Sequence, residues 1–200
     1  MPTHCAGRAG GNASNAVHSQ IHRRACCDTV RRMPAAKKSA AKLRKAPVTA
    51  ADAEAQLAGF LAKFTPEIET LAKAVRSKMK ARLPGAIELV YDNYNALAIG
   101  YSPSEKASEA IISIALYPRW VSLFFLQAKG LRDPGGLLQG SGKVARHIVL
   151  QRAADIDTLA IEDLIGQALE RAKVPIDPLT RRRLVIKSVS AKQRPRRPAK

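Results

Sequence analysis

The residues best suited to chemistry lie in one glycine-rich stretch, 131–150, which reads LRDPGGLLQGSGKVARHIVL. It places Gly140 and Gly142 directly before two cations, Lys143 and Arg146. Backbone N–H groups of a glycine-rich turn can hold an anion when positive side chains lie beside them. We therefore expect a small ligand, an anion or a protein partner to bind near Lys143 and Arg146. The alternative is a tight connection that uses glycine only for its backbone freedom.

The run Gly-Ser-Gly-Lys also suggests a phosphate-binding P-loop, and the spacing excludes it. A P-loop needs a glycine five positions before its Gly-Lys pair and a serine or threonine after the lysine. Those positions hold Leu137 and Val144. The stretch also lacks the change from strand to helix in which a P-loop lies.

Aromatic and amide side chains gather in the middle of the chain, at Tyr91, Asn93, Tyr94 and Trp120. If the segments that carry them pair in one sheet, these groups line one edge of it and form an apolar wall for a small ligand. The alternative is ordinary packing in the core and at the sheet edge.

Glu88 lies at the start of an apolar segment, and we expect it to face a base such as Arg146. A structural ion pair is favoured over catalysis there. Between residues 50 and 178 the chain has one histidine, His147, and no cysteine, and no nucleophile arrangement emerges. We therefore expect a non-enzymatic binding module with no catalytic residue, metal or cofactor. An unrecognised enzyme stays open as an alternative, because triad members need not be near in sequence.

The net charge of +18 belongs to the two ends of the chain. Residues 1–49 and 179–200 each carry a net charge of +9, whereas residues 50–178 have fifteen bases and fifteen acids. Basic tails without aromatic residues attract polyanions through counterion release and cannot stack on bases. We expect non-specific nucleic-acid contact through the tails. In the C-terminal tail the candidate contacts are Arg181, Arg182, Arg183, Arg196 and Arg197.

The apolar pattern predicts an α+β domain over residues 50–178 between two disordered tails. Helical spacing predicts helices at 50–63 and 66–83, and a last helix capped by Asp155 or Asp157. Between them, five strands are expected at 87–91, 96–101, 110–117, 120–127 and 147–151. Short turns between strands imply an antiparallel sheet with the helices on one face, and the third and fourth strands at its centre.

The leader, residues 1–49, is basic and lacks a helical or strand period, so we expect disorder. Met33 followed by a basic Ala/Lys/Pro run suggests a natural start there, and a transit peptide is the rival interpretation. His18, His22 and Cys26 have the four-residue spacing of zinc ligands, but no apolar face accompanies them.

All three cysteines precede residue 28, and no apolar run approaches the length of a membrane span. We expect a cytoplasmic protein with no membrane partner, whose oligomeric state the sequence leaves open.

The stretch 91–148 resembles the YdhG-like family, a domain of unknown function. The resemblance extends over about residues 65–173 and includes the run LPGAIE at 83–88 and GSGK at 140–143. It implies an α+β fold with an antiparallel sheet. One branch of the family has been proposed to act as a frataxin-like intracellular iron chaperone, a role that the resemblance implies for this chain only if matching acidic residues are present.

Iron handling needs clustered carboxylates, because hard cations take oxygen ligands. The nearest acidic pairs are Asp52 with Glu54, Glu67 with Glu69, and Glu162 with Asp163. They fall on three separate predicted helices, where solvated faces explain them as well. The iron chaperone therefore stays the alternative to the binding module.

Overall fold

The computed structural model describes residues 49–198 of the chain. The predictions for the leader, among them disorder, the start at Met33 and the His/Cys spacing, fall on residues 1–48 and lie outside the described residues. The described part is an α+β unit with three α-helices and a six-stranded sheet.

The two N-terminal helices form as the sequence predicts. α1 (Ala50–Leu61) follows Thr49, whose hydroxyl accepts a hydrogen bond from the Asp52 N–H while the Asp52 carboxylate accepts one from the Thr49 N–H. This reciprocal capping box satisfies amides that the first turn leaves free. α2 (Pro66–Arg82) follows Thr65 and has a proline at its first position, where no intrahelical bond is lost.

The cap of the last helix differs from the prediction. α3 (Leu159–Glu170) begins after Thr158. Asp155 belongs to a preceding 3₁₀ turn, η2 (Ala153–Asp157), and accepts hydrogen bonds from two backbone N–H groups at the start of that turn. Asp157 pairs with basic side chains of α2. Both predicted caps are therefore used to fix η2 rather than to start α3.

One mixed sheet forms the second layer. Its first five strands are antiparallel as predicted: β1 (Ile87–Asp92), β2 (Leu97–Ser102), β3 (Ile112–Leu116), β4 (Val121–Phe125) and β5 (Arg146–Leu150), with a 3₁₀ turn η1 (Ala107–Glu109) before β3. The spatial order is β5-β4-β3-β2-β1-β6. The central pair is thus β2 and β3, not β3 and β4, although β4 is also an interior strand.

The sixth strand corrects the prediction for the C-terminus. In place of a disordered tail over 179–200, β6 (Leu184–Val189) pairs in parallel with β1, and Ile186 lies opposite Val90. The side chains of Leu184 and Ile186 pack against the hydrophobic core, and burying them is what orders this basic segment. The sheet is mixed because β6 alone is parallel to its neighbour.

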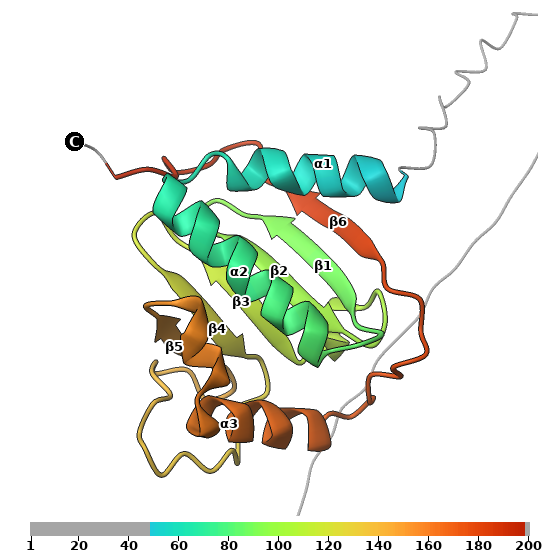
Figure 1. Ribbon diagram of the computed structural model, residues 1–200, viewed down its shortest axis with the longest axis vertical. Coiled ribbons are helices and arrows are strands. Elements are labelled where there is room, and N and C mark those ends of the chain that lie inside the picture. Colours follow the sequence, from blue (N-terminus) through green and yellow to red (C-terminus); the bar gives the residue numbers. More distant parts are fainter. Residues whose placement is uncertain (1–48, 199–200) are drawn as a thin grey trace, which may run out of the picture. The chain divides into compact units, whose positions relative to one another are not determined.

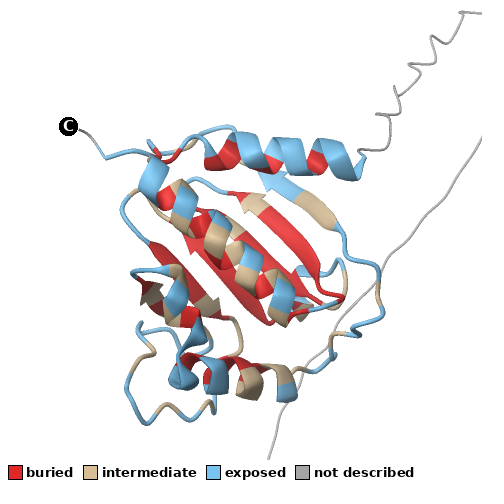
Figure 2. Cartoon of the chain, in the orientation of Figure 1, coloured by how far each residue is buried: buried red, intermediate tan, exposed pale blue. Residues whose placement is uncertain are grey.

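The core lies between the sheet and the helices. α2 crosses the middle of the sheet, α1 lies beside β6, and α3 lies below α2 in the view of Figure 1. Figure 2 shows the buried residues concentrated in the strands that α2 covers. The fully buried side chains on this face include Val90, Leu97, Ile99, Ile112, Ile114, Leu116 and Leu123.

The turn after α2 requires a glycine. Gly85 has a φ of +81°, and a Cβ there would lie 1.9 Å from the carbonyl oxygen of Asp177. A larger residue would therefore collide with the segment that leads from α3 to β6. This close passage brings Arg182 to the C-terminal half of α2.

Candidate functional site

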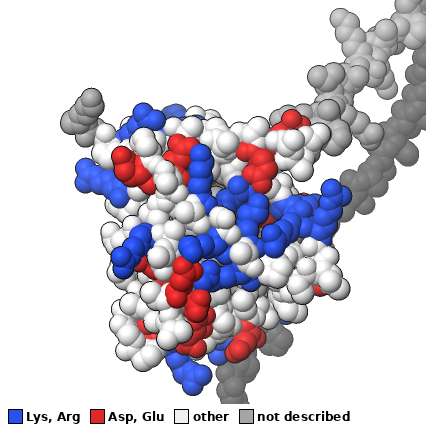
Figure 3. All heavy atoms as spheres, viewed as in Figure 1, with Lys and Arg blue, Asp and Glu red and all other residues white. Residues whose placement is uncertain are grey.

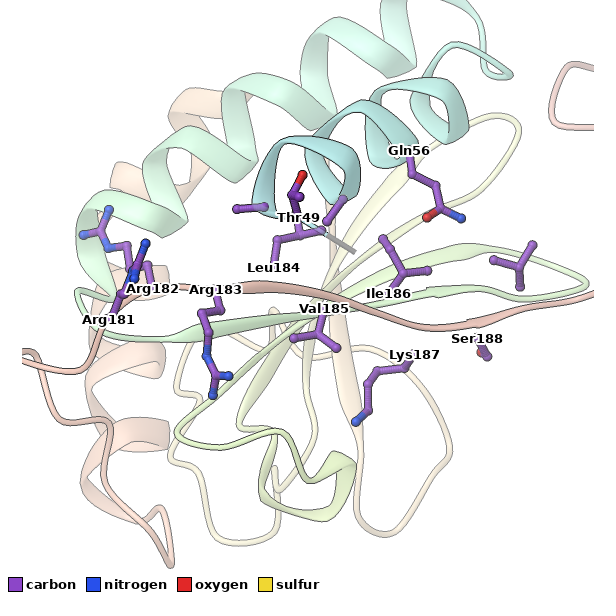
Figure 4. A pocket seen from close by; sticks show the side chains of 13 residues that line it. Thr49, Gln56, Arg181, Arg182, Arg183, Leu184, Val185, Ile186, Lys187 and Ser188 are labelled. Atoms are coloured by element: carbon purple, nitrogen blue, oxygen red, sulfur yellow. The ribbon is translucent and has the colours of Figure 1, made fainter. Parts of the chain in front are cut away.

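A groove lies between α1, α2 and β6. Its largest hollow, about 600 Å³, runs along β6 and is lined by the start of α1 and by residues 181–189. Leu184 and Ile186 point from β6 toward α1, whereas Arg183 and Lys187 point the opposite way (Figure 4). The arginines before β6 thus come from a segment that the strand pairing holds in place.

Two smaller hollows adjoin the first. One of about 130 Å³ lies over the carboxylate of Glu88, and another of about 390 Å³ lies on α2. Arg182 lines all three hollows, so they are parts of one surface. We call this surface the basic groove. Apart from Arg183 and Lys187, whose side chains point away from α1 (Figure 4), its bases are Lys73, Arg76, Lys80, Arg181 and Arg182.

Arg76 joins α1, α2 and β1 at the floor of the basic groove. It donates to the two Glu88 carboxylate oxygens at 2.8 and 2.6 Å and to those of Glu54 at 2.9 and 2.7 Å. The Nζ of Lys80 lies 3.7 Å from Glu54 and 4.0 Å from Glu88. Glu88 does face a base, but that base is Arg76, because α2 packs over β1. Arg146 lies in β5, at the other edge of the sheet.

These contacts fix the charges on the groove floor. Burial acts to lower the pKa of Arg76, but the hydrogen bonds to Glu88 and Glu54 outweigh burial and raise that pKa. The hydrogen bond from Arg76 lowers the pKa of Glu54. Burial raises the pKa of Tyr101 well above its ordinary value, and the charge of Glu88 adds to this shift. Tyr101 is therefore neutral at pH 7, and its hydroxyl lies beside Glu88 without a hydrogen bond of regular geometry.

The uncompensated charge lies at the rim of the groove. Lys73 pairs with Glu69 at 2.6 Å, and the floor carboxylates neutralise Arg76. Arg181 and Arg182 are exposed and form no ion pair within residues 49–198. Figure 3 shows lysine and arginine side chains gathered into a patch over this side of the molecule. The groove therefore presents a positive rim over a neutralised floor.

Three groove bases are not among the predicted site residues. Lys73, Arg76 and Lys80 follow one another at intervals of three and four residues, which places them on one face of α2. That spacing is the signal in the sequence. It does not single them out, because charged stripes on exposed helix faces are common.

A buried ion pair holds the segment after β6, residues 190–198, which we call the C-terminal strap. Arg196 is 5% exposed and donates from Nη2 to the Asp92 carboxylate at 2.8 Å. Gln193 and Lys63 donate to the other carboxylate oxygen of Asp92 at 2.6 and 3.0 Å. The strap is therefore part of the folded domain and not a tail.

The predicted nucleic-acid contacts now fall into four environments. Arg181 and Arg182 are exposed at the basic groove, and Arg183 pairs with Glu105 at 2.9 Å. Arg196 is buried, which removes it from the contact set. Arg197 donates to two carbonyl oxygens just after α1 and keeps an uncompensated charge on the surface.

The glycine-rich stretch forms the long connection from β4 to β5. Gly140 has a φ of +108° and lies against the imidazole of His147, in agreement with a connection that needs glycine. Lys143 is exposed and Arg146 is half-buried. A Cβ on Gly142 would lie 3.9 Å from Nη1 of Arg146, and that nitrogen is buried without a hydrogen-bond partner within residues 49–198. The structure thus brings Gly142 and Arg146 together.

The predicted aromatic wall does not form as one surface. Trp120 is 42% exposed and lines a hollow of about 620 Å³ at the β3–β4 turn. Tyr94 is 52% exposed in the β1–β2 turn, and neither it nor Asn93 or Tyr91 lines that hollow. The hydroxyl of Tyr91 is buried without a partner in the described part of the chain.

Within residues 49–198, no three His, Cys, Asp or Glu residues come together to hold a metal ion. Each acidic pair considered for iron has a member already bound to a base of α2: Glu54 to Arg76, Glu69 to Lys73 and Glu162 to Arg82. The described helices include none with the length and apolar character needed to cross a membrane.

No protein-family model, curated protein or solved structure matches this chain. The resemblance to the YdhG-like family therefore stays a prediction from the residues quoted above.

Proposed function

We propose that the protein is a non-enzymatic binding module that contacts polyanions, nucleic acid above all, through the basic groove. The observation that carries the proposal is the pair Arg181 and Arg182, two exposed cations without a carboxylate partner within residues 49–198. Both line the hollow along β6, Arg182 also lines the two adjoining hollows, and the strand pairing of β6 holds their segment in place. An arginine fixed in place loses less conformational freedom on binding than one in a mobile tail.

The chemistry of the groove suits phosphates rather than a reaction. Arginine guanidinium groups form paired hydrogen bonds to phosphate oxygens. Arg76 donates hydrogen bonds to both carboxylate oxygens of Glu88, the most buried carboxylate of the groove. This carboxylate is therefore already engaged in an ion pair. The proposal therefore assigns phosphate contact to the rim and a structural role to the floor.

The test is binding of the full chain to a fluorescently labelled DNA duplex, followed by anisotropy at about 50 mM salt. The variant replaces Arg181 and Arg182 together with alanine. Losing two phosphate contacts should weaken binding about tenfold or more at this salt concentration. Unrelated duplex sequences should respond alike, because phosphate contacts carry no base information.

A matched control removes the same charge elsewhere. Lys129 and Lys173 are exposed, line none of the described hollows and form no ion pair in the described part of the chain. Replacing both with alanine should leave the affinity nearly unchanged. Equal losses in the two double variants would mean that only net charge matters, and the groove assignment would fall.

The glycine-rich stretch supports a second candidate, a small-anion site at Lys143 and Arg146. The supporting observation is the buried, unpartnered Nη1 of Arg146 beside the backbone of Gly142. An anion there would satisfy a donor that otherwise costs about 1–3 kcal/mol. Thermal shifts across a panel of phosphate compounds should appear in the wild type and vanish in Lys143→Ala/Arg146→Ala. Unchanged shifts in that variant would count against the site.

A further inference from the structure

A second hollow with arginines lies at the opposite end of β6, where the C-terminal strap passes the β3–β4 turn. It measures about 620 Å³ and is lined by Asn95, Tyr117, Pro118, Arg119, Trp120, Arg194, Pro195, Arg197 and Pro198. Its lining contains three arginines, two aromatic rings and no carboxylate. Neither the basic tails alone nor the turn alone would produce this combination.

The aromatic rings are held as a preformed platform. Tyr117 and Trp120 flank the two-residue turn Pro118–Arg119, and the Tyr117 N–H donates to the Trp120 carbonyl oxygen at 2.9 Å. Their ring centroids lie 5.0 Å apart at an interplanar angle of 24°, so the two rings stack. Stacking fixes Trp120 while it stays 42% exposed. A face of this kind is available to a further flat ring.

The strap places cations around that platform. The Arg194 N–H donates to the Tyr94 carbonyl oxygen at 2.9 Å, and Arg197 donates to carbonyl oxygens just after α1 at 3.1 and 3.2 Å. Arg119 lies in the turn that connects the two aromatic residues, and it lines the same hollow. None of the three arginines forms an ion pair with a described residue. Their charge is therefore free to attract phosphates beside an exposed aromatic ring.

We propose that this hollow binds single-stranded nucleic acid, with an unpaired base stacked on Trp120 and its phosphates held by Arg119, Arg194 and Arg197. The inference rests on the proposed function and adds a preference for single strands. Single-strand binders combine aromatic stacking with a positive track for the backbone. A duplex keeps its bases stacked inside and offers only phosphates to such a platform. β6 joins the basic groove to this hollow over about 20 Å, which gives a single strand two positive sites to bridge.

Trp120 is the only tryptophan of the chain, so its fluorescence reports on the hollow directly. The experiment titrates full-length protein with a single-stranded oligothymidine of about 15 nucleotides, a length within known single-strand site sizes. A duplex of equal length and thymidine monophosphate form the other two arms. We expect strong quenching by the single strand, weak quenching by the duplex, and much weaker binding of the mononucleotide.

The variant Trp120→Ala should weaken single-strand binding about tenfold, measured by anisotropy of labelled DNA, and leave duplex binding unchanged. Tyr94→Ala, which removes an aromatic ring of comparable exposure outside the hollow, is the matched control and should change neither. Equal loss for single strand and duplex in Trp120→Ala would overturn the stacking inference. Binding of thymidine monophosphate as tight as that of the oligonucleotide would also overturn the stacking inference.

The two proposals fail in different ways. If Trp120→Ala has no effect while Arg181→Ala/Arg182→Ala weakens binding, the polyanion module stands and the stacking site falls. If the wild-type chain binds neither form of DNA, both proposals fall.

Discussion

Arg196 provides the sharpest test of the folded C-terminus, because a disordered tail and a docked strap predict opposite results for Arg196→Ala. The guanidinium is almost completely buried and donates from Nη2 to Asp92 at 2.8 Å and also to the carbonyl oxygen of Asn93. Removing one partner of a buried ion pair typically costs about 3–5 kcal/mol. A disordered arginine would cost about nothing when replaced.

Two features of the site reduce that figure. The carboxylate of Asp92 keeps its hydrogen bonds from Lys63 and Gln193 when Arg196 is lost. Arg196 also carries two buried donors, Nε and Nη1, without partners in the described part of the chain. Such donors cost on the order of 1 kcal/mol each, and the alanine variant removes them. We therefore expect a net loss of about 2 kcal/mol in the free energy of unfolding.

The measurement is urea unfolding of the full chain, followed by circular dichroism. Arg194→Ala is the matched control, because this arginine lies in the same strap, is exposed and makes no side-chain hydrogen bond to a described residue. Its replacement should change stability by less than about 0.5 kcal/mol. Equal stability of the two variants would refute the docked strap and, with it, the fixed positions of the strap arginines.

Three further predictions follow from the groove floor and the turn beside it. Arg76→Met leaves the buried carboxylate of Glu88 with Lys80 as its one remaining cation among the described residues, so it should lower stability by about 3 kcal/mol in urea unfolding. A loss below about 0.5 kcal/mol would contradict the ion pair. Because the hydrogen bond from Arg76 lowers the pKa of Glu54 from 4.5, this pair stabilises the fold above that pH, and the contribution is lost as the pH falls through the folded-state pKa. The urea midpoint of the wild type should accordingly fall more on acidification than that of Glu54→Gln, and parallel pH profiles would speak against the shift. Gly85→Ala should cost about 2–4 kcal/mol, because Gly85 combines a positive φ with the close approach of another segment. Gly59→Ala in α1, where no atom lies within 4 Å of the new Cβ, should stabilise the protein by about 0.5–1 kcal/mol in the same assay, and similar effects at both glycines would contradict the packing of that turn.

The sequence predicts the helices, strands and turns that depend on residues close together in the chain. Thr49 and Thr65 start the first two helices, and short apolar segments separated by turn residues predict all five antiparallel strands to within a few residues. The turn at Pro118–Arg119 also follows from the sequence, because proline presets the backbone angle of its first central position. Each of these features depends on residues a few positions apart.

β6 is missed because its cause is not local. The run LVIKSV at 184–189 has the β-branched composition of a strand, but basic residues surround it and suggest a solvated tail. The strand forms because it pairs with the open edge of β1, and its partner residues, such as Glu88 for Leu184, lie far earlier in the chain. The same reason explains Glu88, whose partner Arg76 depends on how α2 packs over β1.

The candidate site is predictable only in its residue types. The sequence marks Arg181 and Arg182 as polyanion contacts and Trp120 as a ligand-binding ring, but it assigns them to a tail and to an apolar wall. The structure places the arginines at a groove and the tryptophan beside two strap arginines. Truncating the chain at residue 178 would remove β6 together with the basic residues. Such a truncation therefore cannot separate the effect of charge on binding from the effect of losing a strand.

The salt dependence of DNA binding tests the central claim most directly. The slope of log K against log salt counts the phosphates that a protein neutralises, at about 0.9 per contact. For the full chain on duplex DNA, Arg181→Ala/Arg182→Ala should reduce the magnitude of that slope by about 1.8, and Lys129→Ala/Lys173→Ala should leave it unchanged. A slope that is the same for the wild type and both double variants would show that the basic groove does not contact phosphates, and would contradict the proposed function.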